Sequence, residues 1–549
     1  MYCCLFSAPQ RDSRTTKAGD SYIGPRMRPP ALVWVFLSVV FALNALGQTP
    51  PPAPAAFPAP PAVEKLQKTQ HSIQIDGRTI NYTATAGTLV LKKEDSRPIA
   101  SMFFVAYTRD DIQDKSQRPL SFAFNGGPGS ASIWLHMGAL GPKRVVLGPS
   151  GEQPPPPYHL IDNDDSLIDI TDLVFIDPVS TGYSRNAPGE DPKQFHGLEG
   201  DLNSVANFIY QYTSKFNRWS SPKFLIGESY GTARAAGLSE TLQEQGINLN
   251  GIVFISAVLN FETISFNPGN ELPYILFLPT YTATAWYHKK LPADLQAKSL
   301  EQAVQAAREF ASGDYTLALM KGAKLAGAER AKVAAETARF TGLSKEYVEE
   351  SNLRISPTRF RKELLRTEGK TLGRYDSRLE GSDADSAGER PEYDPSYASV
   401  QGAFTATFNH YVRDDLRWDS ELTYEALTGK VLPWNYERYQ NRYVDTAEML
   451  RQAMAQTPTL RVMVAAGYYD LATPFFSAEY TFNHLGLSPS LQQNVSFAYC
   501  DAGHMLYTVK PCLDGLKRSL TDFYRAAVAA GPAGTGQGAA AAAGPRSSP

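Results

Sequence analysis

The sequence predicts an α/β fold in which a doubly wound, mostly parallel sheet is interrupted by a long, mainly helical insertion. In the first half of the chain, compact apolar runs that are typical of buried parallel strands alternate with helical patterns. The runs occupy residues 172–177, 223–227 and 251–257, and the helical patterns occupy residues 198–216 and 233–245. Two more runs of the same kind return at 460–467 and 495–500, after a long stretch of different character.

The elements that precede these runs predict a different pairing. Short β-branched and aromatic runs bounded by turn residues are typical of antiparallel hairpin strands. They lie at residues 71–76, 79–83, 88–91 and 102–108. A further run, SFAF at residues 121–124, ends in a glycine-rich loop.

Residues 261–459 form the predicted insertion, or lid. Within it, residues 293–341 are rich in Ala, Leu, Lys and Glu at helical spacing, whereas residues 369–394 are charged, turn-rich and weakly patterned. The α/β core is expected over residues 65–260 and 460–530, closed by a last helix at about 513–527.

Residues 1–47 resemble an upstream extension followed by a signal peptide. From Met27 the chain has a positive residue, the uncharged apolar stretch 31–46 and small residues before Gln48, which together are typical of a secretory signal. The stretch is shorter than the roughly 20 apolar residues of a spanning helix, so an uncleaved membrane anchor is the weaker alternative. We expect translation to begin at Met27 and a mature protein, with no membrane span, to be secreted or periplasmic.

Two segments are not expected to pack into a core. Residues 48–64 form a Pro/Ala-rich linker, and residues 531–549 a disordered Gly/Ala-rich tail.

Composition excludes several classes of function. Lys and Arg number 53 against 56 Asp and Glu, a net charge of -3, so the chain has no basic excess for binding nucleic acid. Four cysteines cannot form a disulfide framework in 549 residues. Cys500 and Cys512 either pair or remain free thiols. No motif for a metal or a nucleotide occurs, so we expect no cofactor.

The motif G-x-S-x-G appears at residues 227–231, directly between a strand-like run and a helical pattern. That context is typical of a nucleophile elbow, a tight strand-to-helix turn that exposes a serine above a sheet. An ordinary strand-to-helix turn is the alternative. The pattern makes Ser229 the candidate nucleophile, with the N–H of Tyr230 as one oxyanion donor.

A nucleophilic serine needs a base, and the base needs an orienting acid, in the chain order Ser, Asp, His for this kind of elbow. Asp470 and His504 each follow a predicted strand and therefore lie where open α/β sheets bind ligands. His288 and His484 read as packing or surface histidines.

A second glycine-rich loop, Asn125 to Gly129, follows the run SFAF. Its backbone can approach a substrate closely, so it is a candidate for the second oxyanion donor. A plain Gly-Pro turn is the alternative.

Several blocks together resemble the serine carboxypeptidase family. They are FNGGPGSASIWL (124–135), DLVFIDPVSTGYS (172–184), IGESYG (226–231), GYYD (467–470) and DAGHM (501–505). The resemblance implies an α/β-hydrolase fold with a helical lid. It also implies release of C-terminal residues from peptides, usually at acidic pH, with peptide or protein C-termini as substrates.

The resemblance also assigns roles to individual residues. It implies that Ser229 is the nucleophile, His504 the base and Asp470 its orienting acid. Gly127 and Tyr230 would donate the oxyanion N–H groups. The substrate's terminal carboxylate would be held by the Asn125 side chain, the Gly126 N–H and Glu228.

The chain departs from the family pattern where that carboxylate would bind. Ala123 stands where the family commonly has a tryptophan, and Ala139 where it has a second glutamate that shares a proton with Glu228. Tyr507 replaces the family's proline after the histidine, and the family's usual set of disulfides is absent.

Three functions therefore compete. A serine carboxypeptidase that acts through an acyl-enzyme is the first. An esterase or acyltransferase with the same triad is the second, because the incomplete carboxylate site weakens recognition of a free C-terminus. A non-catalytic binding protein is the third, and intact Ser229, Asp470 and His504 argue against it.

Overall fold

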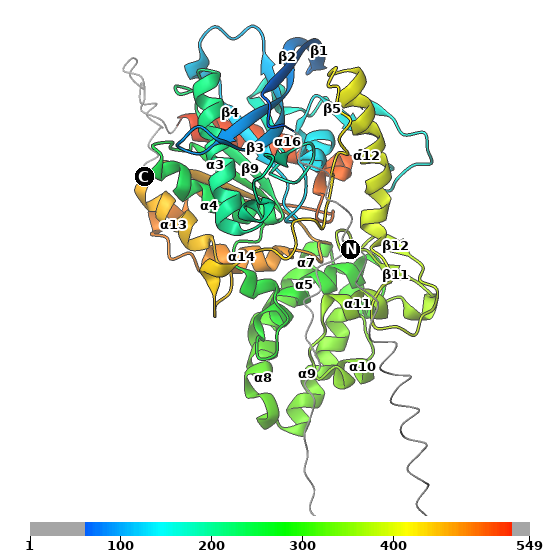
Figure 1. The fold of residues 1–549 in the computed structure, drawn as a ribbon. Coiled ribbons are helices and arrows are strands. Elements are labelled where there is room, and N and C mark those ends of the chain that lie inside the picture. The colour runs from blue at the N-terminus through cyan, green and yellow to red at the C-terminus, as the bar shows by residue number, and fades with distance from the viewer. Residues whose placement is uncertain (1–60, 530–549) are drawn as a thin grey trace, which may run out of the picture. The chain divides into compact units, whose positions relative to one another are not determined.

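The computed structural model describes residues 61–529 (Figure 1). The predicted extension and signal peptide, residues 1–47, and the predicted tail, residues 531–549, lie outside the described residues. Residues 61–64, the end of the predicted linker, have no regular secondary structure. No helix within residues 61–529 combines the length and the apolar character needed to cross a bilayer.

A ten-stranded mixed sheet forms the centre of the described chain, in the order β1-β2-β3-β7-β4-β9-β10-β13-β14, with β8 paired to β3. The strands are β1 (Lys65–Ile75), β2 (Arg78–Lys92), β3 (Pro98–Arg109), β4 (Leu120–Phe124), β7 (Asp172–Ile176), β8 (Arg185–Asn186), β9 (Lys223–Glu228), β10 (Gly251–Ile255), β13 (Arg461–Gly467) and β14 (Val495–Cys500). Neighbours from β7 to β14 run parallel, whereas β1, β2, β3 and the β3–β7 pair run antiparallel. The predicted doubly wound, mostly parallel sheet is confirmed.

The strands of the parallel half are buried on both faces, which explains their continuous apolar character. Along β9, Phe224 and Ile226 belong to one apolar core and Leu225 to the other. Helices α12 and α16 cover the first core, and helices α3, α4 and α13 cover the second (Figure 1).

The helices between residues 61 and 529 have the following bounds. They are α2 (Ile133–Leu135), α3 (Leu198–Lys215), α4 (Tyr230–Glu244), α5 (Leu272–Tyr287), α6 (Ala293–Gln296), α7 (Leu300–Phe310), α8 (Thr316–Lys321), α9 (Gly327–Thr341), α10 (Lys345–Glu350), α11 (Pro357–Glu363), α12 (Pro395–Asp414), α13 (Ala447–Gln456), α14 (Phe475–Asn483), α15 (Pro489–Gln492) and α16 (Lys510–Ala529). The minor strands are β5 (Lys143–Val145), β6 (Leu160–Asp162), β11 (Thr371–Leu372) and β12 (Glu380–Gly381).

The N-terminal strands are longer than the sequence predicts. Residues 78–92 form one strand, β2, where the sequence predicts two strands at 79–83 and 88–91. The small residues Ala84 and Gly87 lie between those runs and lower the local strand signal. Because β2 pairs with β1 on one side and β3 on the other, its backbone stays extended through them.

The segment between β10 and β13 does not form one separate lobe. Helices α5 and α7 to α11 enclose a third apolar core, and α8, α9 and α10 lie together in Figure 1. By contrast, α12 packs on the first sheet core and α13 on the second. Residues 369–394, where the sequence predicts no element, contain the antiparallel pair β11–β12.

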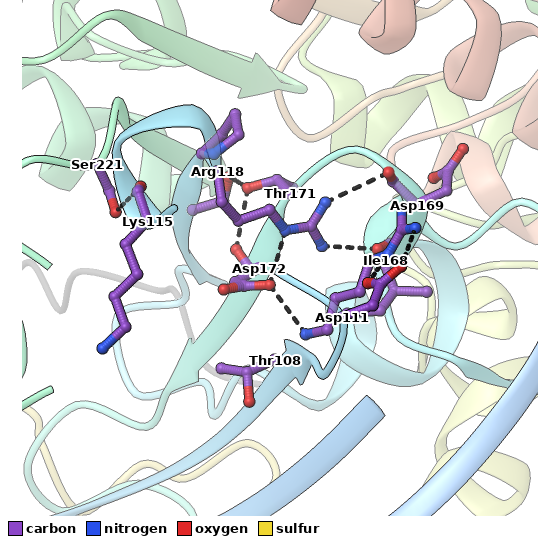
Figure 2. Close-up of polar contacts among 12 residues, drawn as sticks. Thr108, Asp111, Lys115, Arg118, Ile168, Asp169, Thr171, Asp172 and Ser221 are labelled. Carbon is purple, nitrogen blue, oxygen red and sulfur yellow. Dashed lines mark hydrogen bonds and ion pairs between the residues drawn. The ribbon is translucent and has the colours of Figure 1, made fainter. Parts of the chain in front are cut away.

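A buried ion network holds the amino ends of the parallel strands, opposite the edge where β9 meets α4. Asp172, the first residue of β7, accepts from Arg118 Nε at 2.9 Å and from Arg218 Nη1 at 2.6 Å. Arg118 also donates to the carbonyls of Ile168 and Asp169 (Figure 2). Since all three charged side chains are at least nine-tenths buried, removing one partner leaves uncompensated charge in the interior.

We therefore expect Asp172→Ala to lower the free energy of unfolding by about 3–5 kcal/mol, because two buried guanidinium groups lose their counterion. Denaturant titration measures this value. Asp522→Ala is a matched control, since its ion pair with Arg525 is about three-quarters exposed on both sides, and it should leave the midpoint unchanged. Equal midpoints for the two variants would contradict a stabilising role of the buried network.

Candidate active site

The candidate residues lie at the carboxyl ends of neighbouring parallel strands. Ser229 follows β9, Asp470 follows β13 and His504 follows β14, and the sheet order there is β9-β10-β13-β14. Asn125 follows β4, and β4 pairs with β9 on the side of β9 that faces away from β10. Because parallel strands end at the same edge of a sheet, the loops that carry these residues meet there.

Ser229 occupies a strained turn between β9 and α4. Its φ of 60° and ψ of -131° lie in a region that residues with a side chain rarely adopt. A Cβ on Gly227 would stand 2.2 Å from the carbonyl oxygen of Gly231, so the turn requires glycine there. The Ser229 N–H donates to the carbonyl of Ile255 on β10 at 3.0 Å, which fixes the turn against the next strand.

Asp470 and His504 form a buried hydrogen-bonded pair. His504 Nδ1 lies 2.7 Å from Asp470 Oδ2, and the two residues are 2% and 1% exposed respectively. Asp470 also accepts from the N–H groups of Ala472 and Thr473 and from the Thr473 hydroxyl. Burial by itself lowers the pKa of His504, but the Asp470 carboxylate and its hydrogen bond, with Glu228, raise it above the ordinary value.

The structure ties the loops of Ser229 and His504 to the same end of β10. Ser256, the residue after Ile255, donates its hydroxyl to the His504 carbonyl at 2.6 Å, and its own backbone carbonyl oxygen lies 3.0 Å from the Thr473 hydroxyl. The Ser229 hydroxyl itself makes no hydrogen bond to any residue between 61 and 529. Asp470 is thus hydrogen-bonded directly to His504. Ser229 is connected to His504 only through loops that are both hydrogen-bonded to the end of β10.

The glycine-rich loop packs directly on the elbow. A Cβ on Gly126 would stand 2.4 Å from the backbone nitrogen of Tyr230, so the two backbones touch. Within the described part of the chain, the N–H groups of Gly127 and Tyr230 form no backbone hydrogen bond. Buried Arg234 anchors the loop, because its Nη1 donates to the Asn125 carbonyl at 2.6 Å. Its Nε donates to the Asp201 carboxylate at 2.8 Å.

Three side chains converge beside this loop. Glu228 is 3% exposed and accepts from the Tyr507 hydroxyl at 2.6 Å. Asn125 Oδ1 accepts from the Leu135 N–H, and its buried Nδ2 faces Glu228 and Tyr507 without a well-formed hydrogen bond to any described residue. Burial raises the pKa of Glu228 to about 7. The arrangement offers an amide donor and a protonatable carboxyl group to an anion.

Part of the insertion lies on the loops of Asp470 and His504. The His504 N–H donates to the Tyr375 carbonyl, and the Tyr375 ring lies 5.1 Å from the imidazole. Asp376 accepts from the Gly503 N–H at 3.1 Å, and Arg378 donates to the carbonyl of Asp501 at 2.9 Å. These contacts fix the backbone around the imidazole.

A second part of the insertion lies against the glycine-rich loop. The Thr428 N–H donates to the Gly129 carbonyl at 2.9 Å, and the Ala426 carbonyl accepts from the loop's end at Ala131. Farther along, the Trp434 ring packs 5.5 Å from the Tyr230 ring. The insertion therefore contacts both the loops of Asp470 and His504 and the glycine-rich loop.

Sequence reasoning missed Arg234, Tyr375, Asp376 and Tyr507. Arg234 has a recognisable signal, since it is a single cation among the small residues of the helix that follows the elbow. Tyr507 stands where the chain departs from the family motif. Tyr375 and Asp376 have no recognisable sequence signal, because their contacts with the site join residues more than 120 positions apart, about 127 for Asp376 and Gly503.

The remaining downstream histidines are not at the site. The side chain of His288 is buried and lies 2.8 Å from the Ser377 carbonyl, and His484, directly after α14, contacts the carbonyl of Tyr480 in that helix. His410 is exposed and pairs with Asp414.

A disulfide joins Cys500 and Cys512. It closes a loop of the chain that contains both His504 and Tyr507. The sequence leaves open whether these cysteines pair or remain free thiols, and in the structure they pair.

We expect Cys500→Ser with Cys512→Ser to lower the free energy of unfolding by about 2–4 kcal/mol, because the unfolded chain regains the freedom of the closed loop. Thermal unfolding with and without a thiol reductant measures this. Reductant should lower the melting temperature of the wild type and leave that of the double variant unchanged. An equal decrease in both would contradict the assignment to this bond.

Parts of the chain are similar to carboxypeptidases of plants and yeast. Serine carboxypeptidase-like 34 of Arabidopsis thaliana is 29% identical over 194 residues, which are 34% of this chain and 36% of that protein. The pheromone-processing carboxypeptidase KEX1 of Saccharomyces cerevisiae is 31% identical over 156 residues, which are 26% of this chain and 20% of that protein. The alignments thus span about a third of the length of the first relative and a fifth of the length of the second.

Among solved structures, that of the prohormone-processing carboxypeptidase KEX1(delta)p from Saccharomyces cerevisiae aligns with 81% of this chain and 91% of its own, at 19% identity and a TM-score of 0.49. A putative aryl esterase from Burkholderia cenocepacia covers 80% of this chain and 99% of its own, at 12% identity and a TM-score of 0.32.

The fold is that of an α/β-hydrolase, with a doubly wound sheet and a strand–serine–helix elbow. The sequence profile of the serine carboxypeptidase family matches residues 77–508, which is most of the chain. The chain therefore belongs to the serine carboxypeptidase family.

Proposed function

We propose that this protein is a serine carboxypeptidase that hydrolyses the last peptide bond of its substrates through Ser229, His504 and Asp470. The observation that carries the proposal is the buried Asp470–His504 pair at 2.7 Å, at the strand edge that also bears the Ser229 elbow. Family membership supports the same activity.

The first half-reaction forms an acyl-enzyme. Ser229 Oγ attacks the carbonyl carbon of the terminal peptide bond while His504 Nε2 takes the hydroxyl proton. Asp470 accepts from Nδ1, which keeps the imidazole in the tautomer that leaves Nε2 free as a base, and stabilises the imidazolium. The C–N bond then breaks, and His504 returns the proton to the departing amino group.

The second half-reaction restores the enzyme. Water gives a proton to His504 and attacks the acyl carbon, and Ser229 Oγ leaves with the proton that His504 returns. In both halves the N–H groups of Gly127 and Tyr230 would donate to the oxyanion. The close packing of Gly126 on Tyr230 supports this pairing of loop and elbow.

Recognition of the C-terminus would use the Asn125 amide, the Gly126 N–H and a protonated Glu228. Asn125 Nδ2 supports this role, because a buried donor without a well-formed hydrogen bond is normally satisfied by a ligand or water. An ionised Glu228 would instead repel the substrate carboxylate.

The second candidate function is an esterase or acyltransferase that uses the same residues. Ala123 and Ala139, both buried, favour it, since neither supplies a polar contact to a carboxylate. The two functions differ in one measurement: release of end residues from a peptide mixture, followed by mass spectrometry, for free-acid peptides against their C-terminal amides. Equal turnover of acids and amides would favour the second function.

Export is proposed from the sequence of residues 27–47. N-terminal sequencing of the exported protein should find a start near Gln48, and recovery of residues 1–26 would contradict it.

We expect Ser229→Ala to lower kcat by a factor on the order of 10⁶, and His504→Ala by a similar factor, because the two residues act as a unit. The double variant should lose little more than either single one. Asp470→Asn should lower kcat by a factor on the order of 10⁴, because it favours the wrong imidazole tautomer. Steady-state kinetics on one peptide measures all four.

Ser312→Ala, on the exposed surface of the insertion, is the control and should keep full activity. Additive losses in the Ser229/His504 double variant would mean that the two residues do not share one reaction.

We expect KM for free-acid peptides to rise as pH increases through about 7, where burial has placed the pKa of Glu228. Below that pH the neutral carboxyl donates to the substrate carboxylate, and above it the charge repels the substrate. Glu228→Gln keeps a donor at every pH and should flatten the profile, while substrates without a terminal carboxylate should be unaffected. A profile in Glu228→Gln as steep as that of the wild type would assign the titration to another group.

A further inference from the structure

Tyr507 and Glu228 form a buried pair that the sequence does not predict. They stand 279 positions apart, are 1% and 3% exposed, and meet at 2.6 Å through the Tyr507 hydroxyl and Glu228 Oε2. Burial and the Glu228 carboxylate raise the pKa of Tyr507 well above its ordinary value, so the phenol keeps its proton and is the donor.

The Tyr507 ring packs closely against the backbone of a glycine. Gly138 lies against the ring, and a Cβ there would come within 2.5 Å of a ring carbon. The next residue, Ala139, is 1% exposed and brings no polar atom to this space. The polar contact to Glu228 from this side of the site therefore comes from the phenol.

Glu228 faces charged or polar groups from every element packed around it. They are Asn125 after β4, Asp470 after β13, His504 after β14, Tyr375 of the insertion and Tyr507. Among these described neighbours, Tyr507 is the one whose hydrogen bond to the Glu228 carboxylate has full geometry. His504 favours the ionised carboxylate, whereas Asp470 disfavours it.

We propose that Tyr507 is a positioning residue that orients Glu228 and sets the pH range over which the enzyme binds a peptide's terminal carboxylate. This inference rests on the proposed carboxypeptidase function. A phenol differs from a carboxyl group at this place because it donates a hydrogen bond without adding a negative charge or a second titrating proton. Glu228 then shares no proton with a second carboxyl group on this side, and the Tyr507 donor acts on its titration together with burial, His504 and Asp470.

The direction follows from which form the donor stabilises. A hydrogen bond from Tyr507 favours the charged Glu228 carboxylate and so lowers its pKa against the effect of burial. Removing the donor should move the Glu228 titration to higher pH, and strengthening the donor should move it to lower pH.

The test measures kcat and KM against pH for a free-acid peptide and for its C-terminal ester. In Tyr507→Phe the pH at which KM rises should shift upward by about one unit, since a hydrogen bond to a charged group is worth about one pKa unit or more. At acidic pH, KM should also rise several-fold because Glu228 is less well oriented, with kcat changed less than about threefold. The ester profile should not move.

A fluorinated tyrosine at position 507 keeps the ring and the fold and is a stronger donor, so it should shift the same inflection to lower pH. Tyr524→Phe is the matched control, because it removes another buried phenol whose hydrogen bond, to Ser121 at 2.5 Å, lies at the amino end of β4. It should leave the profile unchanged.

The outcomes separate this inference from the function on which it rests. If no variant and no wild-type protein releases end residues, the carboxypeptidase proposal fails. If the wild type does release them but the inflection stays in place in both Tyr507→Phe and the fluorotyrosine protein, the role of Tyr507 is overturned. Opposite shifts in those two proteins support it, and a shift of equal size in Tyr524→Phe would overturn it as a general effect of losing a buried phenol.

Discussion

The pairing of β10 with β9 on one side and β13 on the other is the constraint on which the site depends. The last residue of β10, Ile255, accepts from the Ser229 N–H, and the following Ser256 contacts both Thr473 and His504. Three loops from distant parts of the chain are thus tied to one point of one central strand. Pairing on both sides fixes the register of β10, with Ile255 opposite Glu228 of β9 and Ala465 of β13. The geometry of the candidate residues follows from that register.

Several polar side chains around this edge are buried, and three pairs of them are stabilised by direct hydrogen bonds. The pairs are Asp470 with His504, Glu228 with Tyr507 and Arg234 with Asp201. An unpaired group in such surroundings costs several kcal/mol, so removing one member of a pair destabilises the structure. Arg234 connects this polar shell to the backbone, since it also holds the carbonyl of Asn125. The shell therefore supports the proposed oxyanion and carboxylate sites, and Asn125 Nδ2 has no well-formed hydrogen bond among the described residues.

The insertion contacts the loops that carry the site residues. Residues 375–378 contact the loops of Asp470 and His504, and residues 426–428 contact the glycine-rich loop. Leu471, next to Asp470, belongs to the apolar core of the insertion. Folding of the insertion and alignment of the acid–base pair are therefore linked physically. A change within the third core can alter the site although it touches no reacting group.

The sequence by itself determined the parallel sheet, the elbow and the identity of Ser229, Asp470 and His504 as candidates. These features are local: continuous apolar runs mark strands buried on both faces, and glycines mark turns that exclude a Cβ. The continuity of β2 through Ala84 and Gly87 was decided by pairing on both sides, which no local pattern records. The Tyr507–Glu228 contact, the Arg234 anchor and the contacts of residues 375–378 were likewise decided by the tertiary structure. They join residues far apart in the chain, and a polar side chain in a loop carries no periodicity that indicates its partner.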